Sequence, residues 1–387
     1  MKKQEKKFVL AALALLAITG LLALSGCKND TVPEPTRYTV KFETAHGTVP
    51  ADITVESGNA ATKPTDPTKD GWTFLGWYED SGLTKEFDFS TPVTADTTLY
   101  AKWRANPGTV VSDGFTIDEI KLGKTSEVQV LSEAVNLSSL YVKDSEGNSV
   151  SQIFVENRVG CIQPFVMGQY EVTQQLYSAV MGKWGGTEPS DTYGEGDEYP
   201  AYYVSWYDAV VFCNELTKKV LDDGDCVYYS DAGLTAVYTT GDVTDGKTPY
   251  MDISKSGYRL PTEAEWELAA RGGNAGAKAW QYTYAGSDTI DDVAWYNDSK
   301  THQVGTKAAN SLNLYDMSGN VWEWCWDWHG SIEAGTPSGG AASGSIRVLR
   351  GGSWVYSASD CTVSLRYGGF PRNRNDGLGF RLVRSAN

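Results

Sequence analysis

The chain has 387 residues, of which 41% are hydrophobic and 21% charged, so it exceeds the length of one average domain. Its net charge of -16 argues against nucleic-acid binding, because phosphate recognition needs a basic surface. The three histidines, His46, His302 and His329, form no HExxH zinc motif. Forty glycines together with 13 tryptophans and 22 tyrosines predict a turn-rich protein with large rings in its cores.

Residues 1–26 are predicted to be a secretory signal, with four lysines before an apolar stretch from Phe8 to Leu24. The sequence Leu24-Ser25-Gly26-Cys27 resembles a bacterial lipobox, which implies that Cys27 carries a lipid. The alternative is an ordinary signal peptide whose cleavage site contains a cysteine. Residues 27–36 are polar and contain prolines, as expected of a tether. The resemblance predicts an exported, membrane-anchored lipoprotein at the cell surface or outer membrane.

Five cysteines follow Cys27, and export would permit disulfides. They are Cys161, Cys213, Cys226, Cys325 and Cys361. Cys213 and Cys226 flank a short polar stretch and are a candidate pair. An odd number leaves at least one thiol without a partner inside the chain.

Residues 37–103 are predicted to form a small β module. Apolar and polar residues alternate from Tyr38 to Phe42, His46-Gly47 marks a turn, and further strands are expected at 72–78 and 98–103. The order of these pieces resembles the internalin-type B-repeat, also called the Listeria–Bacteroides repeat. The resemblance implies a β-grasp-like surface module that serves as a spacer or adhesion unit, with His46 as a turn residue.

Residues 104–112 are predicted to be a linker to a large domain at 113–387. Capping residues predict three helix starts, at Thr173, at Ser205 with Asp208, and at Thr262 with Glu265. Gly182 and Gly272-Gly273 are expected to end the first and third helices. The chain after these helices is expected to form turns and short strands, so the fold class is α+β.

Six motifs in this domain occur in a fixed order. They are Gln169–Thr173, Tyr203–Ala209, Gly257–Glu267, Asn313–Trp324, Arg350–Trp354 and Gly379–Leu382. Together they resemble the formylglycine-generating enzyme (sulfatase-modifying factor) family. The resemblance implies a C-type-lectin-like fold of the formylglycine-generating enzyme type after the repeat module.

The residue patterns within these motifs favour structural roles. Tryptophans alternate from Trp322 to Trp328, so one face of a strand would carry four indoles while Glu323 and Asp327 point to the other face. Four charged residues are expected to form ion pairs around a helix start rather than to act as acid–base catalysts. They are Arg259, Glu263, Glu265 and Arg271.

The turn at 316–323 is predicted to bind Ca²⁺, which prefers six to eight oxygen ligands. By resemblance to the family, Asp316 and Glu323 would supply side-chain oxygens, and Gly319 and Val321 would supply backbone oxygens. A second family calcium site would need an asparagine near Ala294-Trp295, where the sequence has none.

The family enzyme converts a sulfatase cysteine to formylglycine with two cysteines that hold copper, a metal suited to thiolates. By resemblance, these cysteines stand three and eight residues after Ser353. Here the two positions are Tyr356 and Cys361. One thiolate cannot form the two-coordinate site, so copper is not expected and no catalytic residue is assigned. Cys361 would be catalytic only if the oxidase function holds.

The segment 355–377 resembles the variable region of proteins diversified by retroelements, which also use a lectin-like fold. In those systems the variable codons end in a pyrimidine and cannot encode Lys, Glu, Gln, Met or Trp, and none of these residues occurs from Val355 to Gly377. The predicted ligand-binding positions are Val355, Tyr356, Ser357, Ser359, Asp360, Leu365, Tyr367, Gly368, Gly369, Phe370, Asn375, Asp376 and Gly377. The predicted fixed framework is Arg366, Pro371, Arg374, Gly379, Phe380 and Arg381.

The order of lipid anchor, repeat and lectin-like head resembles the variable lipoproteins of spirochaetes. The sequence therefore favours a surface lipoprotein whose C-terminal face binds a ligand, expected to be a protein on a host or another bacterial surface. An exported formylglycine-generating oxidase is the first alternative. A structural or adhesive envelope protein without a selective site is the second.

Overall fold

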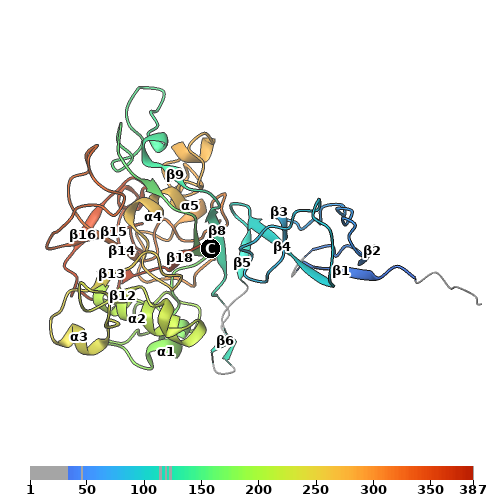
Figure 1. Ribbon diagram of the computed structural model, residues 1–387. Coiled ribbons are helices and arrows are strands. Elements are labelled where there is room, and N and C mark those ends of the chain that lie inside the picture. Colours follow the sequence, from blue (N-terminus) through green and yellow to red (C-terminus); the bar gives the residue numbers. More distant parts are fainter. Residues whose placement is uncertain (1–33, 45–46, 113–115, 118–119, 122–123, 387) are drawn as a thin grey trace, which may run out of the picture. The chain divides into compact units, whose positions relative to one another are not determined.

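The computed structural model describes residues 34–386 apart from 45–46, 113–115, 118–119 and 122–123 (Figure 1). The predicted signal, the lipidation site Cys27, His46 and most of the tether lie outside the described residues. Within these described ranges, every helix is too short or too polar to cross a membrane.

Two compact units make up the described chain, and their boundary falls inside the predicted repeat module. One contains residues up to Lys41 with 52–63 and 88–97, and the other contains 42–51, 64–87 and everything after Thr97. In the first unit, β1 (Arg37–Glu43) pairs antiparallel with β2 (Ile53–Glu56). In the second, β3 (Trp72–Tyr78) pairs antiparallel with β4 (Thr97–Ala105). The three predicted strands are confirmed, and β2 is an addition.

The three predicted helices are confirmed with their caps. Helix α1 (Gln174–Met181) begins after Thr173, whose side chain accepts from the Leu176 amide, and ends at Gly182 in the left-handed conformation. Helices α2 (Trp206–Val220) and α4 (Glu263–Ala270) each begin with a complete capping box. The sequence analysis did not predict the two short helices α3 (Thr240–Thr244) and α5 (Ile290–Val293).

The large domain contains two four-stranded sheets. The first has the order β18-β11-β8-β5 and the second the order β16-β15-β14-β17. The strands of the first are β5 (Val110–Ser112), β8 (Glu127–Leu131), β11 (Phe165–Gly168) and β18 (Val383–Ser385). Those of the second are β14 (Trp322–Trp328), β15 (Arg347–Arg350), β16 (Tyr367–Gly369) and β17 (Leu378–Gly379). Two-residue strands form pairs β6 (Thr116–Ile117) with β7 (Ile120–Lys121), β9 (Val135–Asn136) with β10 (Cys161–Ile162), and β12 (Tyr228–Tyr229) with β13 (Tyr250–Met251).

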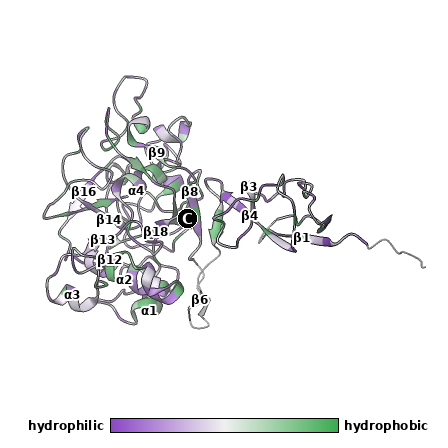
Figure 2. Ribbon diagram, viewed as in Figure 1, coloured by the Kyte–Doolittle hydropathy of each residue, from purple (hydrophilic) through white to green (hydrophobic). Residues whose placement is uncertain are grey.

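Strand β14 separates two hydrophobic cores, because neighbouring side chains of a strand point to opposite faces. Trp322 and Trp324 belong to the core that contains α1 and α2, and Trp326 packs against it. Cys325 belongs to the core that contains α4. The predicted alternation along this strand is confirmed. Helix α1 contains both hydrophobic and hydrophilic residues (Figure 2), and its buried residues include Leu176, Tyr177 and Val180, at the spacing of one helix face.

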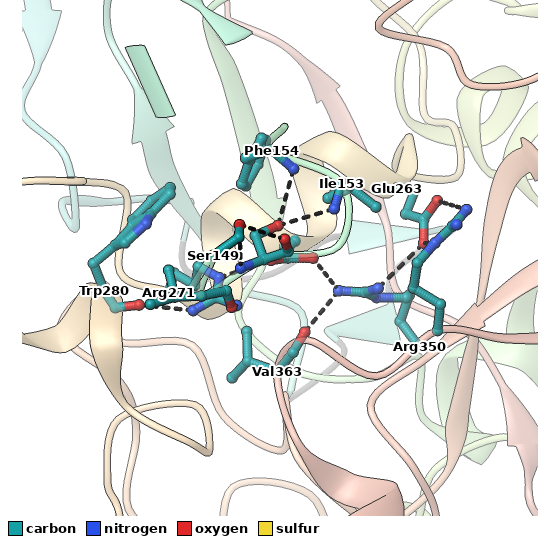
Figure 3. Close-up of polar contacts among 12 residues, drawn as sticks. Ser149, Ile153, Phe154, Glu263, Arg271, Trp280, Arg350 and Val363 are labelled. Carbon is teal, nitrogen blue, oxygen red and sulfur yellow. Dashed lines mark hydrogen bonds and ion pairs between the residues drawn. The ribbon is translucent and has the colours of Figure 1, made fainter. Parts of the chain in front are cut away.

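The predicted ion-pair set around α4 is also confirmed, and its partners include residues that the sequence analysis did not assign to it. Arg259 binds Glu265 through two hydrogen bonds of 2.7 Å. Arg350 reaches from β15 to Glu263, to Glu267 and to the Val363 carbonyl oxygen (Figure 3). The charged side chains of this set are all buried. We refer to the set as the α4 ion-pair centre, and its members are Arg259, Glu263, Glu265, Glu267, Arg271 and Arg350.

Candidate functional site

The predicted ligand-binding segment 355–377 lies between two strands of the second sheet. It leaves β15, passes a short 3-10 helix at Ala358–Cys361, forms the edge strand β16 and returns to β17. Strand β16 pairs with β15, where Leu349 stands opposite Tyr367. Both ends of the segment are therefore fixed by strand pairing, and its loops are supported by the sheet.

Two arginines of the predicted framework anchor the segment to buried carboxylates on other elements. Arg366 binds Glu263 of α4 through two hydrogen bonds of 2.7 Å. Arg374 binds Asp208 of α2 at 2.7 and 2.8 Å. Paired hydrogen bonds of this kind fix both distance and orientation. The arginines thus hold the loops of the segment in place.

Large apolar and aromatic side chains of the segment are exposed. Val355 and Tyr367 are both 51% exposed, Phe370 is 61% exposed and Tyr356 is 38% exposed. Tyr367 stacks on the ring of Trp322 at 5.4 Å, and Tyr356 meets that ring edge-on at 5.6 Å. Trp322 itself is buried, and its Nε1 has no hydrogen-bond partner among the described residues. We call Val355, Tyr356, Tyr367 and Phe370 the aromatic face.

The other predicted positions differ in their surroundings. Ser357, Ser359 and Asn375 are exposed, whereas Asp360, Leu365, Gly368 and Asp376 are half-buried. Asp360 accepts hydrogen bonds from the Ser357 backbone and hydroxyl, so this pair caps the 3-10 helix. Gly369 and Gly377 are buried, and a Cβ at Gly369 would lie 2.7 Å from the Trp324 ring. That these residues contact a bound partner stays a prediction.

Two loops outside the segment adjoin it, and the sequence analysis did not include them in the site. The backbone amides of Asn297 and Asp298 donate to the carbonyl oxygens of Tyr356 and Trp354 at 2.8 and 2.7 Å. The Tyr203 amide donates to the Asn375 carbonyl oxygen at 2.9 Å. Roughly 60 to 170 residues separate these partners along the chain, so no local sequence pattern could have paired them.

Cys361 belongs to this segment, and its thiol is buried. Burial raises its pKa to about 12, so the thiol is protonated at neutral pH and is a poor metal ligand. Tyr356, at the other family position, has no sulfur. The candidate pair Cys213–Cys226 does not form a disulfide, because all five described cysteines are free. Cys226 instead points its Sγ to the Asn214 carbonyl oxygen at 3.8 Å.

The predicted calcium turn contains one oxygen well suited to a cation. Asp316 Oδ2 accepts from the Gly305 amide, whereas the buried Oδ1 has no hydrogen-bond partner among the described residues. Burial raises the pKa of Asp316 to about 6. The carboxylate of Glu171 contacts the same turn, since it accepts hydrogen bonds from the Asn320 side chain and the Val321 amide at 2.6 and 3.0 Å. Burial, and then the charge of Asp316, raise the pKa of Glu171 as well. An excess of buried carboxylates would be relieved by a cation.

Glu323 fits the cation less well, because its oxygens already have partners. Arg381 donates to both at 2.6 and 2.7 Å, and Trp266 Nε1 donates to Oε2 at 2.7 Å. Across the residues that the structure describes, no three His, Cys, Asp or Glu side chains gather into a metal-binding group. Calcium would therefore depend on Asp316 and on the backbone oxygens of Gly319 and Val321. The calcium site stays a prediction.

Most of the chain matches two known domain families. Residues 126–386 match the sulfatase-modifying factor enzyme 1-like domain, so the chain belongs to this family. Residues 38–102 match the Listeria–Bacteroides repeat domain. The protein is thus a mixed α and β protein with a sulfatase-modifying-factor domain after a β-rich repeat module.

Named relatives fall into different functional groups. The chain is 36% identical over 246 residues to the chaperone protein LppX of Paenibacillus barcinonensis, covering 58% of this chain and 81% of that one. It is 36% identical over 154 residues to the formylglycine-generating enzyme of Streptomyces coelicolor, covering 34% of this chain and about half (48%) of the enzyme. Among solved structures it resembles Treponema denticola variable protein 1, with a TM-score of 0.55 and 32% identity, covering 72% of this chain and all (100%) of that one.

Proposed function

We propose that the protein is an exported lipoprotein that binds a protein ligand through the segment 355–377 on a C-type-lectin-like domain. The observation that carries this proposal is the aromatic face, whose large side chains are exposed on a segment anchored by buried ion pairs. Tyrosine and phenylalanine side chains lose little conformational entropy on binding and offer a large contact area. The β-grasp-like repeat would serve as a spacer, and a lipid on Cys27 would attach the chain to a membrane.

Similarity to a Treponema variable protein agrees with a segment that changes between copies of the gene. The likeness to a protein named as a chaperone also agrees with the binding of polypeptides.

Sequencing of codons 345–387 from many isolates and from one clonal culture tests the diversification. We expect changes at the exposed predicted positions, while Gly351-Gly352-Ser353 and Gly379-Phe380-Arg381 stay constant. An unchanging segment would contradict the proposal that the segment is diversified.

Binding itself is tested with random peptides displayed on phage and selected on the immobilised full chain. Combined replacement of Tyr356, Tyr367 and Phe370 by Ala is expected to abolish capture while the melting temperature stays nearly unchanged. Tyr250→Ala is the matched control, because Tyr250 is 46% exposed on β13, outside the segment. A large fall in the melting temperature of the triple variant would show that these rings belong to the core.

The oxidase alternative has a separate test. Copper-dependent oxygen uptake with a cysteine-containing sulfatase peptide would support it, and Cys361→Ser should then abolish the uptake. The burial and raised pKa of the Cys361 thiol, and Tyr356 in place of the other cysteine, lead us to expect no uptake.

A further inference from the structure

Asp376 has a half-buried carboxylate without a partner. It makes no ion pair or hydrogen bond to any other residue in the described part of the chain, and its only contact of this kind is with its own backbone amide. Three acidic side chains in the segment or on elements that contact it have polar partners. Asp208 binds Arg374, Asp298 binds His302, and Asp360 binds Ser357. The carboxylate of Asp376 differs from these three because it has no such partner among the described residues.

Aromatic residues hold the backbone around Asp376 on both sides. Trp354 Nε1 donates to the Asp376 carbonyl oxygen at 3.1 Å, and the Trp322 amide donates to the Gly377 carbonyl oxygen at 2.7 Å. The Tyr203 amide binds the preceding residue, Asn375. Since Trp322 also lies under Tyr356 and Tyr367, Asp376 is placed beside the aromatic face.

The electrostatic effect of Asp376 on its neighbours agrees with this placement. Burial and then the charge of Asp376 raise the pKa of Tyr203. The same charge contributes to the raised pKa of Tyr356, after burial, Tyr367 and Asp360. Burial raises the pKa of Asp376 itself, which means that its charged form is poorly solvated. A cation placed here would gain from the carboxylate and from the faces of the rings.

The wider surface favours a cationic partner as well. The loop at 188–198 contains five acidic residues, which are Glu188, Asp191, Glu195, Asp197 and Glu198, and all of them are exposed. Tyr193 of this loop packs against Trp354 at 5.9 Å, so the loop borders the site. The whole chain has a net charge of -16. A negative surface around a binding site speeds the approach of basic partners and repels acidic ones.

We propose that Asp376, flanked by Tyr203 and Tyr356, receives a lysine or arginine side chain of the protein partner. The carboxylate pairs with the cation, the rings cover its apolar stem, and the acidic loop attracts the basic surface around it. This inference rests on the proposed function, and it adds the chemistry of the partner. It also makes Asp376 the residue that selects basic over neutral ligands in this copy of the segment.

The test uses the phage-displayed peptides, selected in parallel on the wild type, on Asp376→Asn and on Glu146→Gln. Glu146→Gln is the matched control, because it removes one carboxylate from the exposed turn at 144–148. We expect the peptides from the wild type to be enriched in lysine and arginine relative to the unselected library. Asp376→Asn removes a partly buried charge pair, so it should bind these peptides about tenfold more weakly, or weaker still, than the wild type. Glu146→Gln should bind them with the affinity of the wild type.

Two results would overturn the inference, and they differ in what they mean for the proposed function. The first result would be peptides that need the aromatic face but lack basic residues, or that bind Asp376→Asn as well as the wild type. This result would exclude a basic partner, while the proposed binding face would stand. Absence of any enriched peptide, or equal binding to the variant with alanine at 356, 367 and 370, would remove both proposals. Equal melting temperatures of the three proteins exclude misfolding as the cause of a loss.

Discussion

The α4 ion-pair centre and the segment 355–377 use charged and aromatic residues in opposite ways. In the centre, buried arginines and glutamates satisfy one another, as Arg350 does with Glu263 and Glu267. In the segment, rings are exposed and the side-chain carboxylate of Asp376 has no partner residue in the described part of the chain. Two of the six sequence motifs, Gly257–Glu267 and Arg350–Trp354, supply residues of the centre, and all six lie outside the segment. The comparison teaches that the most recognisable motifs of this chain support the fold, while binding is assigned to the segment with the least regular sequence.

Arg350→Ala should produce the largest effect, because it removes a buried guanidinium that Glu263 and Glu267 share and leaves these buried carboxylates with Arg366 and Arg271 alone. We expect it to lower the free energy of unfolding by about 3–5 kcal/mol. Arg37→Ala, which removes the exposed pair with Glu56, should cost less than about 1 kcal/mol. Urea titration measures both. Equal, small losses would show that the centre contributes no more to stability than a surface pair.

Calcium should stabilise the turn at 316–323, which leads into β14 of the sheet that supports the segment. At about one hundred times its dissociation constant, Ca²⁺ would raise the free energy of unfolding by about 2.7 kcal/mol. Asp316→Asn should reduce this gain, since it weakens the side-chain ligand with the free oxygen. Calorimetry and thermal unfolding with and without Ca²⁺ measure the effect. No heat and no thermal shift in the wild type would remove the predicted site.

Framework and exposed positions should differ in their tolerance of substitution. A Cβ at Gly379 would lie 2.5 Å from the Ala201 carbonyl oxygen, so Gly379→Ala should cost about 1–3 kcal/mol. Phe370 is 61% exposed, and Phe370→Ala should change stability by less than about 0.5 kcal/mol. Thermal unfolding of both variants provides the comparison. A similar cost at the two positions would contradict the division into framework and binding residues.

The buried Asp327 should make the α4 ion-pair centre sensitive to pH. Burial, and then the charge of Glu263, raise its pKa from 3.8 to about 7. Because the pKa is higher in the folded state, the stabilising contribution is complete below about pH 4 and is lost as the pH rises towards 7. Asp327→Asn removes this titration and still accepts from the Glu263 amide.

The free energy of unfolding of Asp327→Asn, relative to the wild type, should therefore rise with pH across this window. The slope should reach at most about 1.4 kcal/mol per pH unit. Urea titrations at several pH values measure it. Parallel pH profiles for the wild type and the variant would mean that Asp327 does not titrate there, and the centre would then differ less from the segment than the structure indicates.

The sequence by itself determined the elements whose signals are local. Thr173, Ser205 and Thr262 predicted three helix starts, because a capping side chain binds an amide only three residues away. The alternation from Trp322 to Trp328 predicted the two faces of β14, because neighbouring side chains of a strand point to opposite sides. The ordered motifs also predicted the family to which the chain belongs.

Only the tertiary structure decided which distant residues meet. The disulfide suggested for Cys213 and Cys226 is absent, because Cys226 Sγ points to a backbone oxygen. Arg374 binds Asp208, 166 residues away, and Tyr203 lies beside Asn375 through a backbone hydrogen bond. Such contacts depend on how the sheet and helices pack, and no spacing along the chain encodes them. The unpaired state of Asp376 is of the same kind, because it depends on every neighbour that the fold brings near.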